Sequence, residues 1–184
     1  MKATSSAVID PAAGYAYFGT NTIPGIVVRV DLATFSRAGA LTMEAGENAL
    51  TSAAIDPAAG YAYFGTATSP GIVVQVDLAT LTRVDALTLN TGEDYLASAV
   101  IDPAAGYAYF GTDTAPGIVV QIDLAAFTRV DGLPLQGGEN NLRCAAIDSI
   151  TGYAYFGTNT NPGHVVQVDL ITFSRTGALT LEIG

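Results

Sequence analysis

The sequence predicts an all-β chain made of four similar units. The heptapeptide GYAYFGT starts at Gly14, Gly60, Gly106 and Gly152, so it recurs every 46 residues, and four such units account for all 184 residues. Each unit holds four short segments rich in β-branched and aromatic residues, separated by turn-forming residues, which is typical of strands. No segment shows the period of an amphipathic helix. The four units are residues 1–46, 47–92, 93–138 and 139–184.

The second unit shows the four expected strands in order. Segments A to D are residues 52–56, 61–66, 72–78 and 83–89. A Pro-Ala-Ala-Gly turn separates A from B, a Pro-Gly turn separates B from C, and the loop 90–95 leads to the next unit. In the first unit the corresponding strands are expected near residues 5–9, 15–20, 25–31 and 37–43, with a repeat every 46 residues.

Segment B is apolar on both of its faces. Side chains alternate along a strand, so Tyr15 and Tyr17 share one face while Ala16 and Phe18 share the other. A half-buried strand would carry polar residues on one face. We therefore expect each sheet to be covered on both sides, with Gly19 and its counterparts at places where a neighbouring sheet comes close.

A four-stranded unit of this length, buried on both faces, is typical of one blade of a β-propeller. Blades stand face to face around an axis, and their strands are most crowded near that axis. Segment A has the smallest side chains, as in Ser52, Ala53 and Ala54. We therefore expect segment A to be the innermost strand of each blade.

The stretches IDPAAGYAYFGT and PGIVVQVDLAT resemble the bacterial YVTN/WD40-like β-propeller repeats, and the resemblance covers the whole chain. It implies the blade fold but little about activity. The Val-Asp or Ile-Asp that closes segment C occupies the position of Trp-Asp in WD40 blades, and without the tryptophan the WD40 histidine–aspartate network is not implied. Natural rings of this type usually have six to eight blades. Four blades therefore suggest half of a larger ring, either a fragment of a natural propeller or an engineered chain based on one.

The charge balance argues against two kinds of partner. The formal net charge is -10, with seven basic residues in the whole chain. Nucleic acids require a basic surface, and an anionic membrane would repel an acidic protein. The single cysteine excludes an intramolecular disulfide, and no apolar run reaches transmembrane length. The first ten residues contain no hydrophobic signal segment, so we expect either a cytoplasmic protein or one whose export signal has been removed.

Two aspartate series and one arginine series recur once per unit. The first aspartate series lies in the turn after segment A and consists of Asp10, Asp56, Asp102 and Asp148. The second aspartate series ends segment C and consists of Asp31, Asp77, Asp123 and Asp169. The arginines begin segment D and are Arg37, Arg83, Arg129 and Arg175. A ring of carboxylates could bind a cation, but aspartates in turns more often bond their own backbone. The arginines are expected to pair with Glu47, Glu93 and Glu139, and anion binding is the alternative.

The remaining candidates are a lone histidine, a lone cysteine and the repeated tyrosines. His164 replaces an isoleucine and has no second histidine for a zinc site, so we interpret it as a substitution at an edge or turn. Cys144 replaces a serine of segment A and is interpreted as a small buried residue. The tyrosines could stack on a sugar or peptide, but their repetition favours packing between blades.

The repeat symmetry argues against catalysis, because an active site needs different residues converging on one point. We therefore expect no catalytic, cofactor-binding or metal-binding residues. An enzyme such as a propeller lactonase or lyase would need an asymmetric cluster near the axis. The favoured function is a structural module that binds itself, and the alternative is a propeller that binds a peptide, sugar or ion at a ring face or in the central channel.

Two chains are expected to form one closed ring of eight blades through their terminal blades. An open arc would leave apolar faces of the first and fourth blades in water, and a two-fold axis would close the ring. Met1 aligns with Glu47 and Gly184 with Gly46, which places the break in the loop between D and A. A charged residue in place of Phe18 or Tyr17, on opposite faces of the first blade, should in one case break the dimer.

Overall fold

The computed structural model describes residues 3–181, and this part of the chain consists of sixteen β-strands joined by turns and short loops. Blade 1 contains β1 (Thr4–Asp10), β2 (Tyr15–Thr20), β3 (Ile26–Asp31) and β4 (Ser36–Thr42). Blade 2 contains β5 (Leu50–Asp56), β6 (Tyr61–Thr66), β7 (Ile72–Asp77) and β8 (Thr82–Thr88). Blade 3 contains β9 (Leu96–Asp102), β10 (Tyr107–Thr112), β11 (Ile118–Asp123) and β12 (Thr128–Pro134). Blade 4 contains β13 (Leu142–Asp148), β14 (Tyr153–Thr158), β15 (Gly163–Asp169) and β16 (Ser174–Leu181).

Each blade is a four-stranded antiparallel sheet in which the strands pair in chain order. The expected fold class, an all-β chain of four-stranded blades, is confirmed. In the first unit the strand ends agree with the sequence prediction to within one residue. The outer limits of the first and last predicted units, with Met1 and Gly184, lie outside the described residues.

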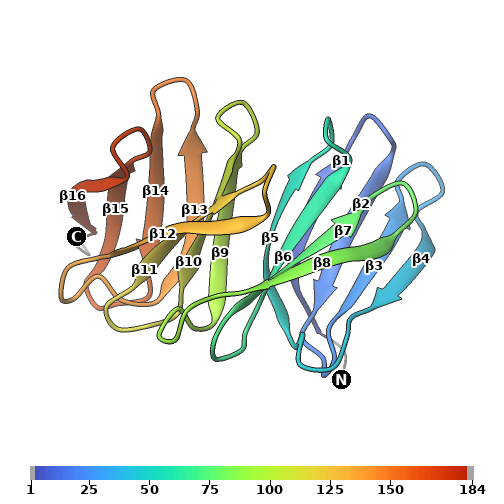
Figure 1. The fold of residues 1–184 in the computed structure, drawn as a ribbon, viewed down its shortest axis with the longest axis horizontal. Helices are drawn as coiled ribbons and strands as arrows, with labels where there is room; N and C mark the ends of the chain where they lie inside the picture. The colour runs from blue at the N-terminus through green and yellow to red at the C-terminus, as the bar shows by residue number, and fades with distance from the viewer. Residues whose placement is uncertain (1–2, 182–184) are drawn as a thin grey trace.

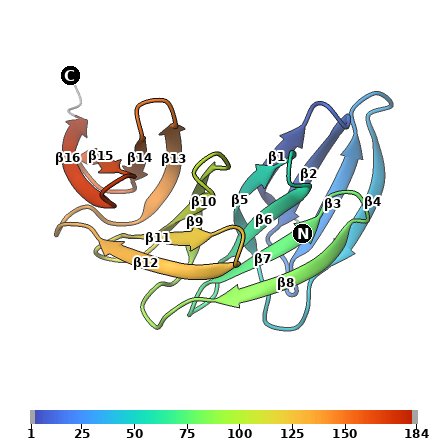
Figure 2. The same cartoon turned by 45° about the horizontal axis from the view of Figure 1, so that its top comes forward.

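The four blades stand side by side in an arc, with blade 1 and blade 4 at opposite ends (Figure 1). The first strand of each blade contacts the first strand of the next, from β1 to β5, β9 and β13. These strands lie on the inner side of the arc, while β8 and β12 lie on its outer side (Figure 2). These contacts confirm the prediction that segment A is innermost. The small side chains of this segment allow the strands to crowd there.

The apolar core lies between neighbouring blades rather than within one. We call the side of a blade that carries Tyr17 and Val27, or their counterparts, its tyrosine face, and the side that carries Ala62 and Phe64, or their counterparts, its phenylalanine face. At each junction the tyrosine face of one blade packs on the phenylalanine face of the next. The apolar character of both faces of GYAYFGT therefore has a direct cause, since each face meets a different neighbour.

Leu50, the first residue of β5, links blade 2 to blade 1. A Cβ added at Gly19 would lie 2.8 Å from the Leu50 Cβ, so glycine is required there, as the sequence predicts. Backbone hydrogen bonds reinforce the contact: the Gly25 amide donates to the Glu47 carbonyl at 2.8 Å. The loops before blades 2, 3 and 4 are thus fixed to the blades that precede them.

Candidate functional site

The aspartates that end the first strand of each blade cap their own turns. Asp10 Oδ1 accepts hydrogen bonds from the amides of Ala12 and Ala13 at 3.1 and 3.0 Å, and Gly14 follows with a φ of 76° in the left-handed region. Similar bonds to a following amide occur at Asp56, Asp102 and Asp148. The turn-capping interpretation of this series is confirmed.

The second aspartate series does the same in the turn between the third and fourth strands. Asp31 Oδ1 accepts from the amides of Ala33 and Thr34, and the Thr34 amide is the main cause of the lowered pKa of Asp31. Within residues 3–181, no group of three or more His, Cys, Asp or Glu side chains is arranged to hold a metal ion. Both series thus cap turns in this part of the chain.

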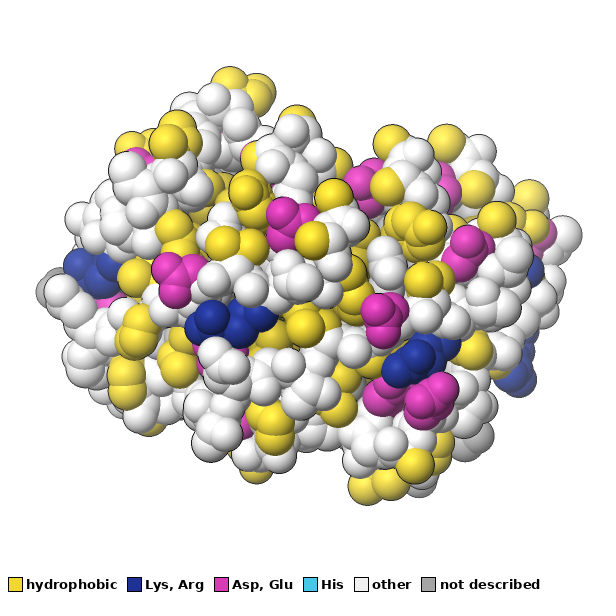
Figure 3. All heavy atoms as spheres, viewed as in Figure 1, with side chains coloured by type: hydrophobic (Ala, Val, Ile, Leu, Met, Phe, Trp, Pro, Cys, Tyr) yellow, Lys and Arg dark blue, Asp and Glu magenta, His cyan; other side chains and the backbone are white. Residues whose placement is uncertain are grey.

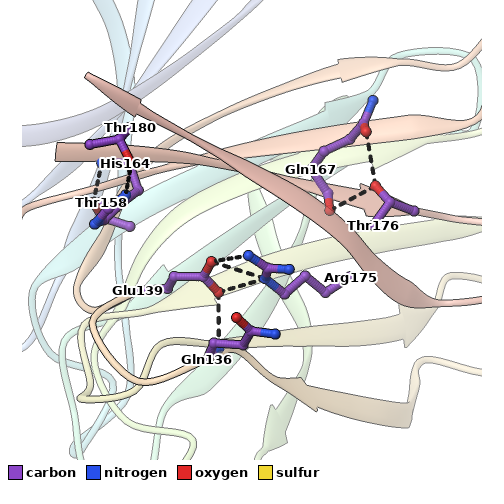
Figure 4. Close-up of polar contacts among 8 residues, drawn as sticks. All are labelled: Gln136, Glu139, Thr158, His164, Gln167, Arg175, Thr176 and Thr180. Atoms are coloured by element: carbon purple, nitrogen blue, oxygen red, sulfur yellow. Dashed lines mark hydrogen bonds and ion pairs between the residues drawn. The ribbon is translucent and has the colours of Figure 1, made fainter. Parts of the chain in front are cut away.

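The expected pairing of arginine with glutamate occurs in blades 2, 3 and 4. Figure 4 shows the pair in blade 4, where Arg175 Nε donates to both carboxylate oxygens of Glu139 at 2.9 and 2.8 Å. The Gln136 amide donates to the same carboxylate at 2.9 Å. Because only 6% of the Glu139 side chain is exposed, the small contribution of an exposed ion pair does not apply. These pairs fix the loop that enters each blade, and in the first unit Met1 stands where the glutamate would be.

His164 is the second residue of β15, beside the turn that precedes it. Its amide donates to Thr158 Oγ1 at 2.8 Å, and its Nδ1 lies 3.3 Å from Thr180 Oγ1 (Figure 4). Both contacts are local to blade 4. This placement agrees with the prediction of a single substitution beside a turn.

The prediction that Cys144 is buried is wrong, because this side chain is exposed. Its serine counterparts Ser52 and Ser98 are 4% and 5% exposed. The difference follows from position: Cys144 pairs with Gly157 on the tyrosine face of blade 4, which has no following blade within the described chain. The sequence could not reveal this, because the substitution itself is conservative.

The second tyrosine of each GYAYFGT copy is buried at a blade junction wherever another blade follows. Tyr17, Tyr63 and Tyr109 are each 1% exposed, which confirms the packing interpretation. Tyr63 Oη accepts a hydrogen bond from Gln75 Nε2 at 3.4 Å. In blade 1 an arginine replaces this glutamine. The Arg29 guanidinium carbon lies over the Tyr15 ring, 4.9 Å from its centre. The sequence analysis missed Arg29, although the change from glutamine at one repeat position was a visible signal.

A groove accompanies each internal junction, on the side of the turns that follow the innermost strands. Between blades 2 and 3 it has a volume of about 460 Å³ and is lined by Asp56, Tyr61, Gln75 and Phe127, among others. Equivalent grooves occur at the other two junctions. Each groove combines a carboxylate, tyrosines and apolar side chains, and each is formed by two blades.

The phenylalanine face of blade 1 is more exposed than the same face of the other blades. Phe18 is only half-buried, whereas Phe64, Phe110 and Phe156 are fully buried. Ile9 is 53% exposed on the innermost strand of this blade. With Ala7 and Ala16 these residues line an apolar groove of about 210 Å³.

The tyrosine face of blade 4 is exposed in the same way at the other end of the arc. Leu179 is 66% exposed, and Leu181 is 49% exposed, whereas its counterpart Met43 is 4% exposed. Leu179 lines a groove of about 420 Å³ together with Tyr155 and Val165. The two ends of the described chain therefore present the two faces that meet at every internal junction.

The visible surface carries few basic side chains, and most of those in view lie next to acidic ones (Figure 3). Hydrophobic side chains are scattered between them. Residues 3–181 contain no helix of the length and hydrophobicity needed to cross a membrane.

The arrangement of blades defines an open four-bladed arc of a β-propeller. Similar solved structures include hydrazine synthase from Kuenenia stuttgartiensis, with a TM-score of 0.83 and 15% identity over 97% of this chain and 49% of that one. The WD40 repeats of RRP9 match with a TM-score of 0.76 and 10% identity over 98% of this chain and 51% of that one. U3-55K matches with a TM-score of 0.79 and 10% identity over 100% of this chain and 54% of that one. The chain thus spans about half the length of these structures, and the likeness concerns the fold alone. No protein-family model matches the sequence, and no curated protein matches it.

Proposed function

We propose that this protein is a structural, self-assembling module, two copies of which close into one eight-bladed propeller. The observation that carries the proposal is the exposure of the phenylalanine face of blade 1 and the tyrosine face of blade 4. Every internal junction joins a tyrosine face to a phenylalanine face. A second copy related by a two-fold axis brings the same two faces together twice, which closes the ring.

Apolar burial drives this association. Residues such as Phe18, Ile9 and Leu179 would move from water into contacts already made by their counterparts in other blades. Each square ångström of apolar surface removed from water stabilises the dimer by about 25 cal/mol. Large exposed apolar patches on soluble proteins usually mark such interaction surfaces.

A charged residue at the exposed end face tests the proposal. Phe18→Asp should dissociate the dimer, because the carboxylate would be buried against the second copy without a partner. Ala12→Asp adds the same charge to an exposed turn of blade 1 and should leave the dimer intact, as judged by its mass in solution. Tyr17→Asp is unsuitable for this purpose, because Tyr17 is buried between blades 1 and 2 and its loss would damage the fold. A Phe18→Asp variant that keeps the mass of the wild type contradicts the proposed junction.

We also propose that the module has no catalytic activity. The fourfold repetition supports this, because an active site needs different residues that converge on one point. The histidine and the aspartates also make contacts within their own blades. A turnover reaction abolished by His164→Ala or by Asp148→Asn would overturn this part of the proposal. The four identical copies of GYAYFGT further lead us to infer an origin in a larger YVTN/WD40-like propeller, as a fragment or as an engineered chain.

Ligand binding is the second candidate function, and the grooves between blades favour it. The groove between blades 2 and 3 offers Asp56 and Gln75 for hydrogen bonds and Tyr61 for an aromatic contact, a combination suited to a sugar or short peptide. Calorimetric titration with mono- and disaccharides tests it. Heat of binding that disappears in Gln75→Ala supports this function, and no heat with any sugar contradicts sugar binding.

A further inference from the structure

A leucine fills a socket made by two glycines at each internal junction. Leu50 is fully buried, and a Cβ added at Gly25 would lie 2.7 Å from its Cγ. The same arrangement recurs at the next two junctions, where Leu96 meets Gly65 and Gly71, and Leu142 meets Gly111 and Gly117. We call the space against the two glycines the glycine socket. Any side chain on these glycines would collide with the leucine.

Blade 4 has the same glycine socket, formed by Gly157 and Gly163, and it lies open at the end of the described chain. A Cβ added at Gly163 would meet Leu181 Cδ1 at 3.6 Å, which is an ordinary contact distance. Leu181 is 49% exposed, whereas Leu89 and Leu135 at the same repeat position are each 5% exposed. No following blade therefore covers this socket within the described residues.

Thr4 is the residue of blade 1 that corresponds to Leu50. Thr4 pairs with Thr20 across the same irregularity of register that places Leu50 opposite Thr66. Because the backbone register is the same, the Thr4 side chain projects from blade 1 as Leu50 projects from blade 2. Thr4 is exposed, as expected for a residue that has no neighbouring blade in the described chain.

We infer that Thr4 of one copy enters the glycine socket of blade 4 in the other copy, and that it makes the two chain-to-chain junctions the weak junctions of the ring. This inference rests on the proposed dimer. Threonine is shorter than leucine, and it puts a hydroxyl group where the other sockets hold the apolar side chain of a leucine. The ring should therefore open at these junctions before any internal junction separates.

The substitution Thr4→Leu tests the inference, because it restores at the chain-to-chain junction the residue found at the other three. Each junction should gain about tenfold in affinity from the added apolar burial, so the dissociation constant should fall about 100-fold with two junctions per dimer. Sedimentation velocity over a dilution series measures it. Thr128→Leu, an equal change at an exposed position on β12, is the matched control and should leave the constant unchanged.

A second substitution, Gly163→Ala, blocks the socket without affecting the arc. The added methyl group makes only ordinary contacts within blade 4, but it would collide with a leucine that enters from a second copy. The double variant Thr4→Leu, Gly163→Ala should therefore lose the gain of Thr4→Leu. A wild-type dimer that Thr4→Leu does not tighten overturns the inference and leaves the proposed ring intact. A mass of one chain for the wild type and Thr4→Leu at all concentrations overturns the proposed ring and the inference together.

Discussion

The Phe127 ring lies over the Tyr63 ring of the preceding blade, with ring centroids 6.0 Å apart and planes tilted by 35°. The pair recurs at the next junction, where Phe173 covers Tyr109 at 6.0 Å and 33°. These phenylalanines sit in the turn between the third and fourth strands in a left-handed conformation, with a φ of 48° at Phe127. A phenylalanine rarely adopts this conformation, and here it places the ring against the neighbouring blade.

Phe35→Ala should weaken the dimer. Phe35 occupies the same turn of blade 1 with a φ of 48°, yet it is 88% exposed. In the closed ring it would cover Tyr155 of the second copy, and aromatic pairs contribute about 0.5–1.5 kcal/mol beyond their buried area. The loss is counted twice per dimer, so the dissociation constant should rise at least about tenfold, as measured by sedimentation velocity.

The control for this prediction is the same substitution at an internal junction. Phe127→Ala should lower the free energy of unfolding by about 1–3 kcal/mol, while Phe35→Ala should leave the unfolding of the separated chain almost unchanged. Equal effects of both variants on chain stability, with no effect of Phe35→Ala on mass, would contradict the assignment of Phe35 to the chain-to-chain junction.

Cys144 should react with iodoacetamide more slowly in the dimer than in the separated chain. The side chain is exposed on the tyrosine face of blade 4, which the second copy would cover. Alkylation followed by mass spectrometry at high and low protein concentration measures the rate. The rate should rise on dilution and be fast at every concentration in Phe18→Asp. A rate independent of concentration in a protein whose mass shows a dimer would place the interface elsewhere.

Leu96→Thr should lower the free energy of unfolding by about 2–4 kcal/mol, because it leaves a cavity and a hydroxyl group in the glycine socket between blades 2 and 3. Leu96 is fully buried there. Urea unfolding by circular dichroism measures the change. A loss below about 0.5 kcal/mol would show that the socket contributes little, and would weaken the comparison with Thr4.

The ion pair of Glu139 should stabilise the fold at neutral pH and less in acid. Burial alone would raise the pKa of Glu139, but hydrogen bonds from Arg175 and the Gln136 amide, with the arginine charge, outweigh burial and lower it. A lowered pKa in the folded state stabilises the fold above the pKa of the unfolded chain, and the stabilisation is lost as pH falls through the folded value. The stability difference between wild type and Glu139→Gln should therefore shrink below about pH 4.5. A difference that grows in acid would contradict this.

Tyr109 should make the fold less stable in strong base. Burial raises the pKa of Tyr109 to about 12, although the hydrogen bond from Gln121 acts in the opposite direction. The unfolded chain releases this proton near pH 10, so stability should fall between pH 10 and 12. Tyr109→Phe should show a smaller fall over this range than Tyr95→Phe, which removes a 45% exposed tyrosine. Identical pH profiles for the two variants would contradict the assignment.

The repeat carried most of the information about the fold. Because Tyr15 and Tyr17 lie on one face of GYAYFGT and Ala16 and Phe18 on the other, both faces are apolar, and burial between two blades could be predicted. The small residues around Ala53 likewise predicted the innermost strand. Turn residues such as Gly14 placed the strand ends, since they require conformations that strands do not contain.

The chain-to-chain contacts were less accessible to sequence analysis, because they depend on where a residue lies along the arc. Cys144 differs little from its serine counterparts, and its exposure comes from the position of its blade. Phe35 and Phe127 are the same residue type at the same repeat position. Only the structure shows that Phe35 is exposed while Phe127 covers Tyr63. The role of Leu50 required knowledge of which glycines it meets in the neighbouring blade.

The mass of the wild-type protein in solution shows whether two chains close into one ring. Sedimentation equilibrium of the 184-residue chain over a range of concentrations measures it without a label or a substitution. Closure of an eight-bladed ring predicts a species of twice the 18.8 kDa chain mass, which dissociates on dilution without forming larger assemblies. A single species of 18.8 kDa at every concentration would rule out the two-chain ring.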